Sequence, residues 1–124
     1  MPALAKPIGS YRPFVKMGEW IFVSGQIPQD AQSGAIQLFG GDVEKQTDLV
    51  LQNLAAVLKS AGADCSQVAK TTVYLTSMAD YPAINRAYSK VFGDQPPARA
   101  TVAVQSLPKG VAVEIDAIAM AVRR

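Results

Sequence analysis

The sequence contains no histidine and a single cysteine, Cys65. The absence of histidine excludes Ser-His-Asp and Cys-His catalytic sites and metal sites built on imidazole. One cysteine excludes an internal disulfide and any Cys-x-x-Cys motif. Cys65 lies in a polar connector after a predicted helix, where no neighbour in the sequence lowers the pKa of its thiol, so we interpret it as a bystander. Acid–base chemistry must therefore rely on Asp, Glu, Lys, Tyr or bound water.

Concentrated positive charge and long apolar runs are also lacking. Twelve Lys and Arg against ten Asp and Glu give a net charge of +2. The lysines are scattered, whereas nucleic-acid-binding proteins carry a concentrated basic patch. No apolar run approaches the roughly 20 residues of a membrane-spanning helix, and the N-terminus lacks the apolar core of a secretion signal. We therefore expect a cytoplasmic protein with neither a nucleic-acid nor a membrane partner.

The apolar content is sufficient for a hydrophobic core. Of the 124 residues, 49% are hydrophobic. Chains of this length usually fold as one domain. We therefore predict a single domain over residues 1–124.

Two amphipathic helices are predicted. The clearer one begins after Asp42, a suitable N-cap, and ends before Gly62, a suitable C′ residue. Its apolar stripe follows the helical period and consists of Val43, Thr47, Val50, Leu51, Leu54, Val57, Leu58 and Ala61. The second helix is predicted from about Tyr81 to Phe92, with Asp80 as its cap and Gly93 after its last turn.

Short segments rich in β-branched and aromatic residues predict strands. They cover residues 8–16 (an edge strand, because of its proline), 20–24, 35–39, 68–76, 97–104 and 111–122. This order of elements predicts an α+β fold, a two-layer sandwich of a mixed sheet with both helices on one face. The other face carries apolar residues, including Ala112, Ile118 and Met120, and a second copy of the chain would cover it.

The last two predicted strands carry the charged residues of greatest interest. In the first of them Arg99 and Thr101 share a face, and in 111–122 Glu114 and Asp116 interrupt an otherwise apolar face. The linker between the strands contains a proline and a glycine, as a chain reversal requires. Pairing of the two strands would bring Arg99 close to Glu114, either as a structural ion pair or as the centre of a site.

A series of short motifs extends over nearly the whole chain, from Gly9 to Met120. The motifs are Gly9-Ser10-Tyr11, Ser24-Gly25-Gln26-Ile27-Pro28, Gln46, Asn53-Leu54, Lys70-Thr71-Thr72-Val73-Tyr74, Asn85-Arg86-Ala87-Tyr88, Pro97-Ala98-Arg99, Leu107-Pro108-Lys109-Gly110 and Val113-Glu114-Ile115-Asp116-Ala117-Ile118-Ala119. Each is weak alone, but in this order and spacing they resemble those of the Rid family, the reactive-intermediate (imine) deaminases, also called YjgF-like proteins.

The resemblance implies a chorismate-mutase-like α+β sandwich, normally a homotrimer with ligand pockets between subunits. It also implies hydrolysis of reactive 2-imino or enamino acids, such as 2-iminobutanoate and 2-iminopropanoate, to 2-keto acids and ammonia. These imines leak from pyridoxal-phosphate dehydratases, so the implied role is the control of metabolite damage. The resemblance implies neither a metal nor an organic cofactor.

The resemblance also assigns roles to individual residues. Arg99 matches the residue that grips the substrate carboxylate, and Glu114 matches the one that positions the attacking water. Both roles suit the chemistry, because a guanidinium binds a carboxylate bidentately and a carboxylate can accept a proton from water. The substrate-binding residues implied in the same way are Tyr11, Ser24, Gly25, Asn85 and Thr101. We interpret Asp116 as a structural or rim carboxylate.

Some positions depart from the family's usual pattern and leave the substrate open. Ser10 replaces a common proline, Thr101 stands where a cysteine is frequent, and the bulky Arg12-Pro13-Phe14 follows Tyr11. If that segment lines the cleft, it adds a cation or narrows the entrance. An aminoacrylate of the pyrimidine-degradation type is therefore an alternative substrate. A non-enzymatic trimer that binds small carboxylates or acts as a chaperone is an alternative function. The absence of histidine and of a basic patch argues against an RNA-cleaving role.

Overall fold

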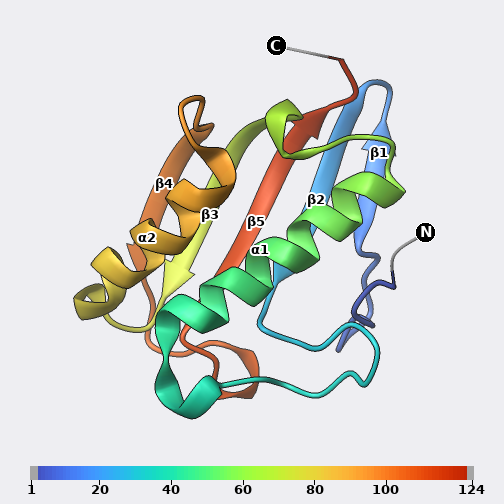
Figure 1. The fold of residues 1–124 in the computed structure, drawn as a ribbon. Coiled ribbons are helices and arrows are strands. Elements are labelled where there is room, and N and C mark those ends of the chain that lie inside the picture. The colour runs from blue at the N-terminus through green and yellow to red at the C-terminus, as the bar shows by residue number, and fades with distance from the viewer. Residues whose placement is uncertain (1–2, 123–124) are drawn as a thin grey trace.

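The computed structural model describes residues 3–122, which form one layer of strands and one layer of helices. In chain order the elements are β1 (Phe14–Met17), β2 (Trp20–Gln26), α1 (Val43–Ser60), β3 (Val68–Leu75), α2 (Tyr81–Phe92), β4 (Ala98–Ala103) and β5 (Val113–Met120). The strands form a five-stranded sheet in the order β1-β2-β5-β3-β4. Both helices lie on the same face of this sheet (Figure 1). The predicted two-layer α+β sandwich is therefore confirmed.

The predicted pairing of the last two strands is wrong. β4 pairs with β3 in parallel, and β5 lies between β2 and β3, antiparallel to both. The reason is the helix between β3 and β4: a strand–helix–strand crossover returns the chain to its starting end, so the two strands run parallel. The segment after β4 then carries the chain back to the centre of the sheet.

Two local predictions also need correction. The expected strand at residues 35–39 is reduced to an isolated bridge between Gln29 and Ile36, followed by a 3₁₀ turn over Phe39–Gly41. Asp80 precedes α2 as predicted, but its side chain makes no capping hydrogen bond. A 3₁₀ turn over Met78–Asp80 leads directly into the helix and places Asp80 in helical backbone geometry, where its side chain does not fold back over the first turn.

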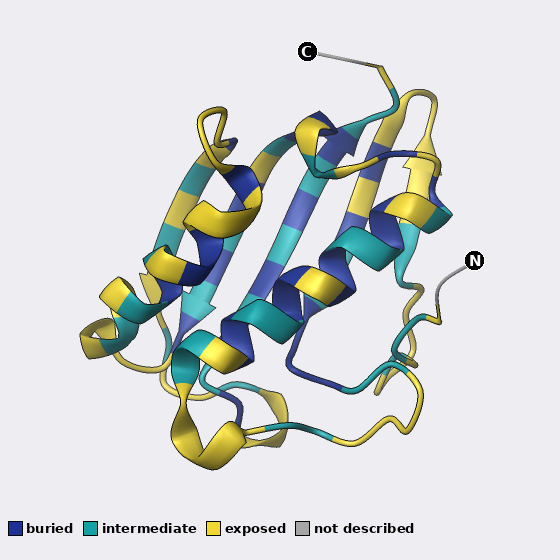
Figure 2. Cartoon of the chain, viewed as in Figure 1, coloured by how far each residue is buried: buried dark blue, intermediate teal, exposed yellow. Residues whose placement is uncertain are grey.

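The hydrophobic core fills the space between the helices and the sheet. Of the predicted stripe on α1, every residue is buried except Val43, which is half-buried. On β5 the side chains alternate, so that Val113 and Ile115 are buried whereas Glu114 and Asp116 are half-buried (Figure 2). Each large apolar side chain buried in this way stabilises the fold by about 1.5–3 kcal/mol.

The opposite face of the sheet is apolar and uncovered in a single chain. Trp20 and Phe22 of β2 are 42% and 43% exposed. They lie opposite Met120 and Ile118 of β5 in the sheet register. An exposed apolar surface of this kind is typical of a protein–protein contact. Among the described residues, the structure contains no helix with the length and hydropathy needed to cross a membrane.

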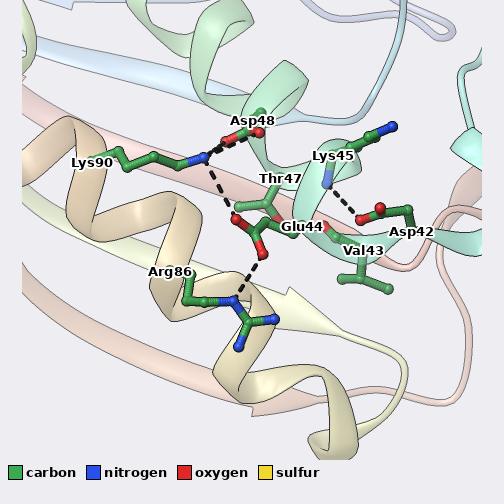
Figure 3. Close-up of polar contacts among 8 residues, drawn as sticks. All are labelled: Asp42, Val43, Glu44, Lys45, Thr47, Asp48, Arg86 and Lys90. Atoms are coloured by element: carbon green, nitrogen blue, oxygen red, sulfur yellow. Dashed lines mark hydrogen bonds and ion pairs between the residues drawn. The ribbon is translucent and has the colours of Figure 1, made fainter.

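A network of ion pairs joins the two helices (Figure 3). Nε of Arg86 lies 2.8 Å from Oε1 of Glu44, and Nζ of Lys90 lies 3.0 Å from Oδ1 of Asp48 and 3.6 Å from Oε2 of Glu44. Because both cations are more than half exposed, water screens these pairs, and each adds little to stability. The network therefore links α1 to α2 without contributing much to the stability of the fold.

A buried amide on α1 holds the segment that follows β2. Nδ2 of Asn53 donates hydrogen bonds to the carbonyl oxygens of Ile27 (3.1 Å) and Gln29 (2.8 Å). The Ile27 oxygen also accepts a hydrogen bond from the Gln29 amide (2.8 Å), so Asn53 adds a second bond at that atom. The Asn53 side chain therefore ties this loop to α1 through two of its carbonyl groups.

We predict that Asn53→Ala lowers the free energy of unfolding by about 1–3 kcal/mol, because two buried hydrogen bonds to the loop are lost. Urea denaturation measures this change. The matched control is Gln52→Ala, since Gln52 is the exposed neighbour on the same helix. Equal losses in the two variants would contradict the assigned role of Asn53.

Candidate functional site

A pocket of about 320 Å³ lies where the loop after β2 meets the start of β5. Its walls are formed by Ile8, Tyr11, Ser24, Gly25, Ile27, Pro108 and Glu114. Four of the predicted site residues are therefore brought together: Tyr11, Ser24, Gly25 and Glu114. We call these four residues the acidic half-site. Ile8, Ile27 and Pro108 complete the wall; sequence reasoning did not assign them to the site.

Gly25 lets the Glu114 carboxylate approach the backbone of β2. The register of β2 against β5 shifts between Val23 and Gln26, so the strand bulges at this point. A Cβ atom built on Gly25 would overlap the carboxylate of Glu114. Glycine is therefore required here by a close approach, a common reason for glycine at the end of a strand.

Hydrogen bonds fasten the segment before β1 as the opposite wall of the pocket. Oγ of Ser24 donates to the carbonyl oxygen of Arg12 (2.6 Å), and the Ser24 amide donates to that of Pro13 (3.0 Å). The Ile8 amide donates to Oη of Tyr11 at 3.3 Å. Ser24 thus acts by positioning this wall.

The unusual residues after Tyr11 contribute backbone and core contacts. The main chain of Arg12 accepts the Ser24 bond, while Phe14 packs against the hydrophobic core. Phe14 therefore does not narrow the pocket.

The environment of Glu114 favours its protonated form. Burial and then the nearby charge of Asp116 raise the pKa of the Glu114 carboxyl above its ordinary value. Asp116 is itself held in place, because its carboxylate accepts hydrogen bonds from the Thr72 amide and from Oη of Tyr74, each at 3.2 Å. Asp116 therefore has the structural position expected of it, and its charge makes Glu114 a stronger base.

Arg99 lies on the other side of the sheet, against α2. Its Nη2 donates hydrogen bonds to Oδ1 of Asn85 (2.8 Å) and to Oη of Tyr81 (3.1 Å). The guanidinium carbon lies 4.7 Å from the ring centre of Tyr88 and 5.5 Å from that of Tyr81, within the range of cation–π attraction. We call Tyr81, Asn85, Tyr88, Arg99 and the neighbouring Thr101 the cationic half-site.

The two tyrosines of the cationic half-site were missed by sequence reasoning, although a signal for them exists. Tyr81, Asn85 and Tyr88 are spaced i, i+4 and i+7, so they share one face of α2. Oη of Tyr88 forms a 2.7 Å hydrogen bond with Oγ1 of Thr71, which lies opposite Arg99 in the parallel ladder. A strand–helix–strand reading of residues 68–103 would have placed this helix face over Arg99.

The predicted closeness of Arg99 and Glu114 does not occur within one chain. β3 lies between the strands that carry them. The two side chains also lie on opposite faces of the sheet. Arg99 is paired with Thr71, which points toward α2, whereas Glu114 is paired with Tyr74 on the uncovered face. The ion pairs of residues 3–122 are confined to the network between α1 and α2. Arg99 is thus a cation held by neutral and aromatic groups. The prediction of a structural ion pair between Arg99 and Glu114 within one chain is wrong.

The remaining candidate groups add no further chemistry. Burial, together with the charge of Asp64, raises the pKa of the Cys65 thiol, which agrees with its interpretation as a bystander. Within residues 3–122 no cluster of three or more His, Cys, Asp or Glu side chains is placed to hold a metal ion. The two half-sites therefore provide a cation without an ion-pair partner among residues 3–122 and a carboxyl of raised pKa that faces a pocket.

Comparison with known proteins gives consistent relatives. The family described as endoribonuclease L-PSP matches residues 2–121. A RutC family protein of Pyrococcus abyssi is 46% identical over 114 residues, which cover 92% of this chain and 88% of the relative. The 2-iminobutanoate/2-iminopropanoate deaminase of Rattus norvegicus is 43% identical over 113 residues, covering 91% of this chain and 81% of the relative.

A solved structure shows the same fold. The crystal structure of E. coli TdcF with bound serine matches with a TM-score of 0.87 and 38% identity, covering 95% of this chain and 92% of that one. Such agreement in sequence and in fold over nearly the whole length leaves one assignment. The chain belongs to the endoribonuclease L-PSP family, which comprises the Rid and YjgF-like proteins.

Proposed function

We propose that the protein is a deaminase that hydrolyses 2-imino or enamino acids to 2-keto acids and ammonia. One observation carries the proposal: a cation and a carboxylate, Arg99 and Glu114, each lack the partner that would neutralise it within the described chain. Groups left in this state are typical of functional sites, because uncompensated charge costs stability. The 2-iminobutanoate/2-iminopropanoate deaminase among the relatives supports the same chemistry.

We further propose that the site is completed between two copies of the chain in a homotrimer. The cationic half-site faces α2 and the acidic half-site lies on the other side of the sheet, so one chain cannot close around a small substrate. The exposed apolar face around Trp20 and Phe22 supports such an assembly. In a closed ring of three copies, each interface joins two different surfaces, as an acidic half-site meeting a cationic one requires.

In the proposed mechanism Arg99 binds the carboxylate of the substrate and so fixes the imine carbon in place. Glu114 accepts a proton from a water molecule as the water oxygen adds to that carbon. Glu114 returns that proton to the nitrogen, which gives a carbinolamine. The hydroxyl of the carbinolamine then passes its own proton by way of Glu114 to the nitrogen, the carbon–nitrogen bond breaks, and ammonia leaves as the carbon–oxygen double bond forms. Because burial raises the pKa of Glu114, its carboxylate is a stronger base than an ordinary glutamate and is suited to take and return a proton.

A small-carboxylate-binding protein without catalytic activity is the second candidate. The serine in the E. coli relative favours it, because serine presents a carboxylate but has no imine to hydrolyse. Binding requires the cationic half-site alone, whereas hydrolysis also requires Glu114. The two functions therefore differ in their dependence on Glu114.

We predict that the protein hydrolyses 2-iminobutanoate made freshly by a threonine dehydratase, in competition with semicarbazide. Arg99→Ala and Glu114→Gln are expected to lower the rate by about 100-fold or more, as loss of carboxylate binding or of a general base does. Arg86→Ala is the matched control, since Arg86 lies on the same helix as Asn85 but pairs with Glu44.

Two results of this assay would contradict the deaminase proposal. One is a wild-type protein that does not divert the imine from semicarbazide. The other is an Arg99→Ala variant as active as the Arg86→Ala control. If the wild type is inactive but binds 2-oxobutanoate through Arg99, the protein is a carboxylate-binding protein.

We also predict a pH-dependent stability difference for Glu114→Gln. Because the fold raises the pKa of Glu114, the stability of the wild type falls as pH rises from the unfolded pKa, about 4.3, through the folded one. The glutamine variant cannot ionise, so it should melt at a higher temperature than the wild type at pH 7.5 and lose this advantage at pH 4.

Glu44→Gln provides a control of opposite sign, because the hydrogen bond from Arg86 lowers the pKa of Glu44. This variant should lose stability relative to the wild type at pH 7.5 and less at pH 4. Thermal unfolding at one protein concentration measures both variants. A Glu114→Gln protein destabilised equally at both pH values would show that burial of the charge is not the dominant effect.

A further inference from the structure

Arg99 uses both hydrogens of one nitrogen for contacts within its own chain. Nη2 carries two hydrogens, and it donates to Oη of Tyr81 at 3.1 Å and to Oδ1 of Asn85 at 2.8 Å. Each guanidinium edge that grips a carboxylate with two parallel N–H groups includes Nη2. While these bonds persist, a bound carboxylate obtains a hydrogen bond from Nη1 or Nε only, and its second donor must come from another group.

Tyr81 has such a donor in the right place. Its hydroxyl has one hydrogen and two lone pairs, and the bond from Arg99 uses a lone pair, so the hydrogen is still available. The side chain is 39% exposed, so a ligand can reach it. Tyr88 differs, because its buried hydroxyl is already engaged with Thr71. Of the two tyrosines around Arg99, only Tyr81 can therefore serve a ligand.

We propose that Tyr81 contacts the substrate: its hydroxyl accepts a hydrogen bond from Arg99 and donates its own hydrogen to the carboxylate that Arg99 binds. The inference rests on the proposed function for the identity of the ligand, a small 2-oxo or 2-imino carboxylate. Tyr81 is then a determinant of specificity, because its hydroxyl stabilises ligands that place an acceptor oxygen beside the guanidinium.

If Tyr81 instead competes with the ligand for Arg99, its removal changes the affinity in the opposite direction. If the ligand gripped Arg99 through a two-nitrogen fork, the Tyr81 hydroxyl would first have to release Nη2. Tyr81 would then compete with the ligand, and its removal would tighten binding. The direction of the change in affinity therefore decides between the two roles.

The experiment compares Tyr81→Phe with Arg86→Ala, using 2-oxobutanoate as the probe in isothermal titration calorimetry. We expect Tyr81→Phe to raise the Kd about tenfold, the effect of losing one hydrogen bond to a charged group. Arg86→Ala changes an exposed residue of the same helix that pairs with Glu44 and not with Arg99, so the Kd should change by less than about twofold. An unchanged or lower Kd for Tyr81→Phe would overturn the proposal.

A second measurement separates ligand contact from mere support of Arg99. In NMR spectra of protein labelled at Cζ of its tyrosines, the signal of Tyr81 is the one that is missing from Tyr81→Phe. This signal should shift when 2-oxobutanoate is added to the wild type. A Tyr81 that only orients Arg99 would keep its bond to Nη2, and its signal would stay in place, which would overturn the proposal. In turnover with 2-iminobutanoate, the variant should show a raised KM and a largely retained kcat.

The outcomes for this inference and for the deaminase proposal are distinguishable. A wild type that binds 2-oxobutanoate but hydrolyses no imine overturns the deaminase function, while the affinities of the two variants still decide the role of Tyr81. A wild type that does not bind 2-oxobutanoate overturns the inference about Tyr81 directly.

Discussion

The two-residue period of the sheet separates the two charged groups on which the proposed chemistry depends. Arg99 lies on the face covered by α2, and Glu114 lies on the uncovered face, two strands away. Had they met in one chain, they would have formed an ion pair and neutralised each other. The fold keeps them apart within one chain, so neither neutralises the other there, and in the proposed assembly a ligand would lie between the two charges.

The surroundings of both groups follow from this separation. Around Arg99 the chain places an amide oxygen and two tyrosine rings, which hold a cation without cancelling it. Around Glu114 it places a glycine bulge and a second carboxylate, Asp116, which raises the pKa of the first. Ionisation of Glu114 costs stability at neutral pH, because the fold raises the pKa of its carboxyl, and the core between the helices and the sheet offsets that cost.

Local features of the fold could be predicted from the sequence, whereas strand partners could not. Asp42 and Gly62 mark the ends of α1 because capping depends on near neighbours, and the alternation on β5 follows from residue spacing alone. The place of β5 between β2 and β3 depends on segments far away in the sequence, which no local pattern encodes. The roles of Arg99 and Glu114 came from family resemblance, and Tyr81 was missed because its contact crosses from α2 to β4.

The most direct test of the shared site mixes two inactive variants, Arg99→Ala and Glu114→Gln, which are unfolded and refolded together in equal amounts. Random assembly gives each interface about a one-in-four chance of joining an intact Arg99 from one copy to an intact Glu114 from another. We predict that the mixture recovers about a quarter of the wild-type deaminase activity, whereas either variant refolded alone stays inactive. A mixture as inactive as its components would contradict a site built from two copies.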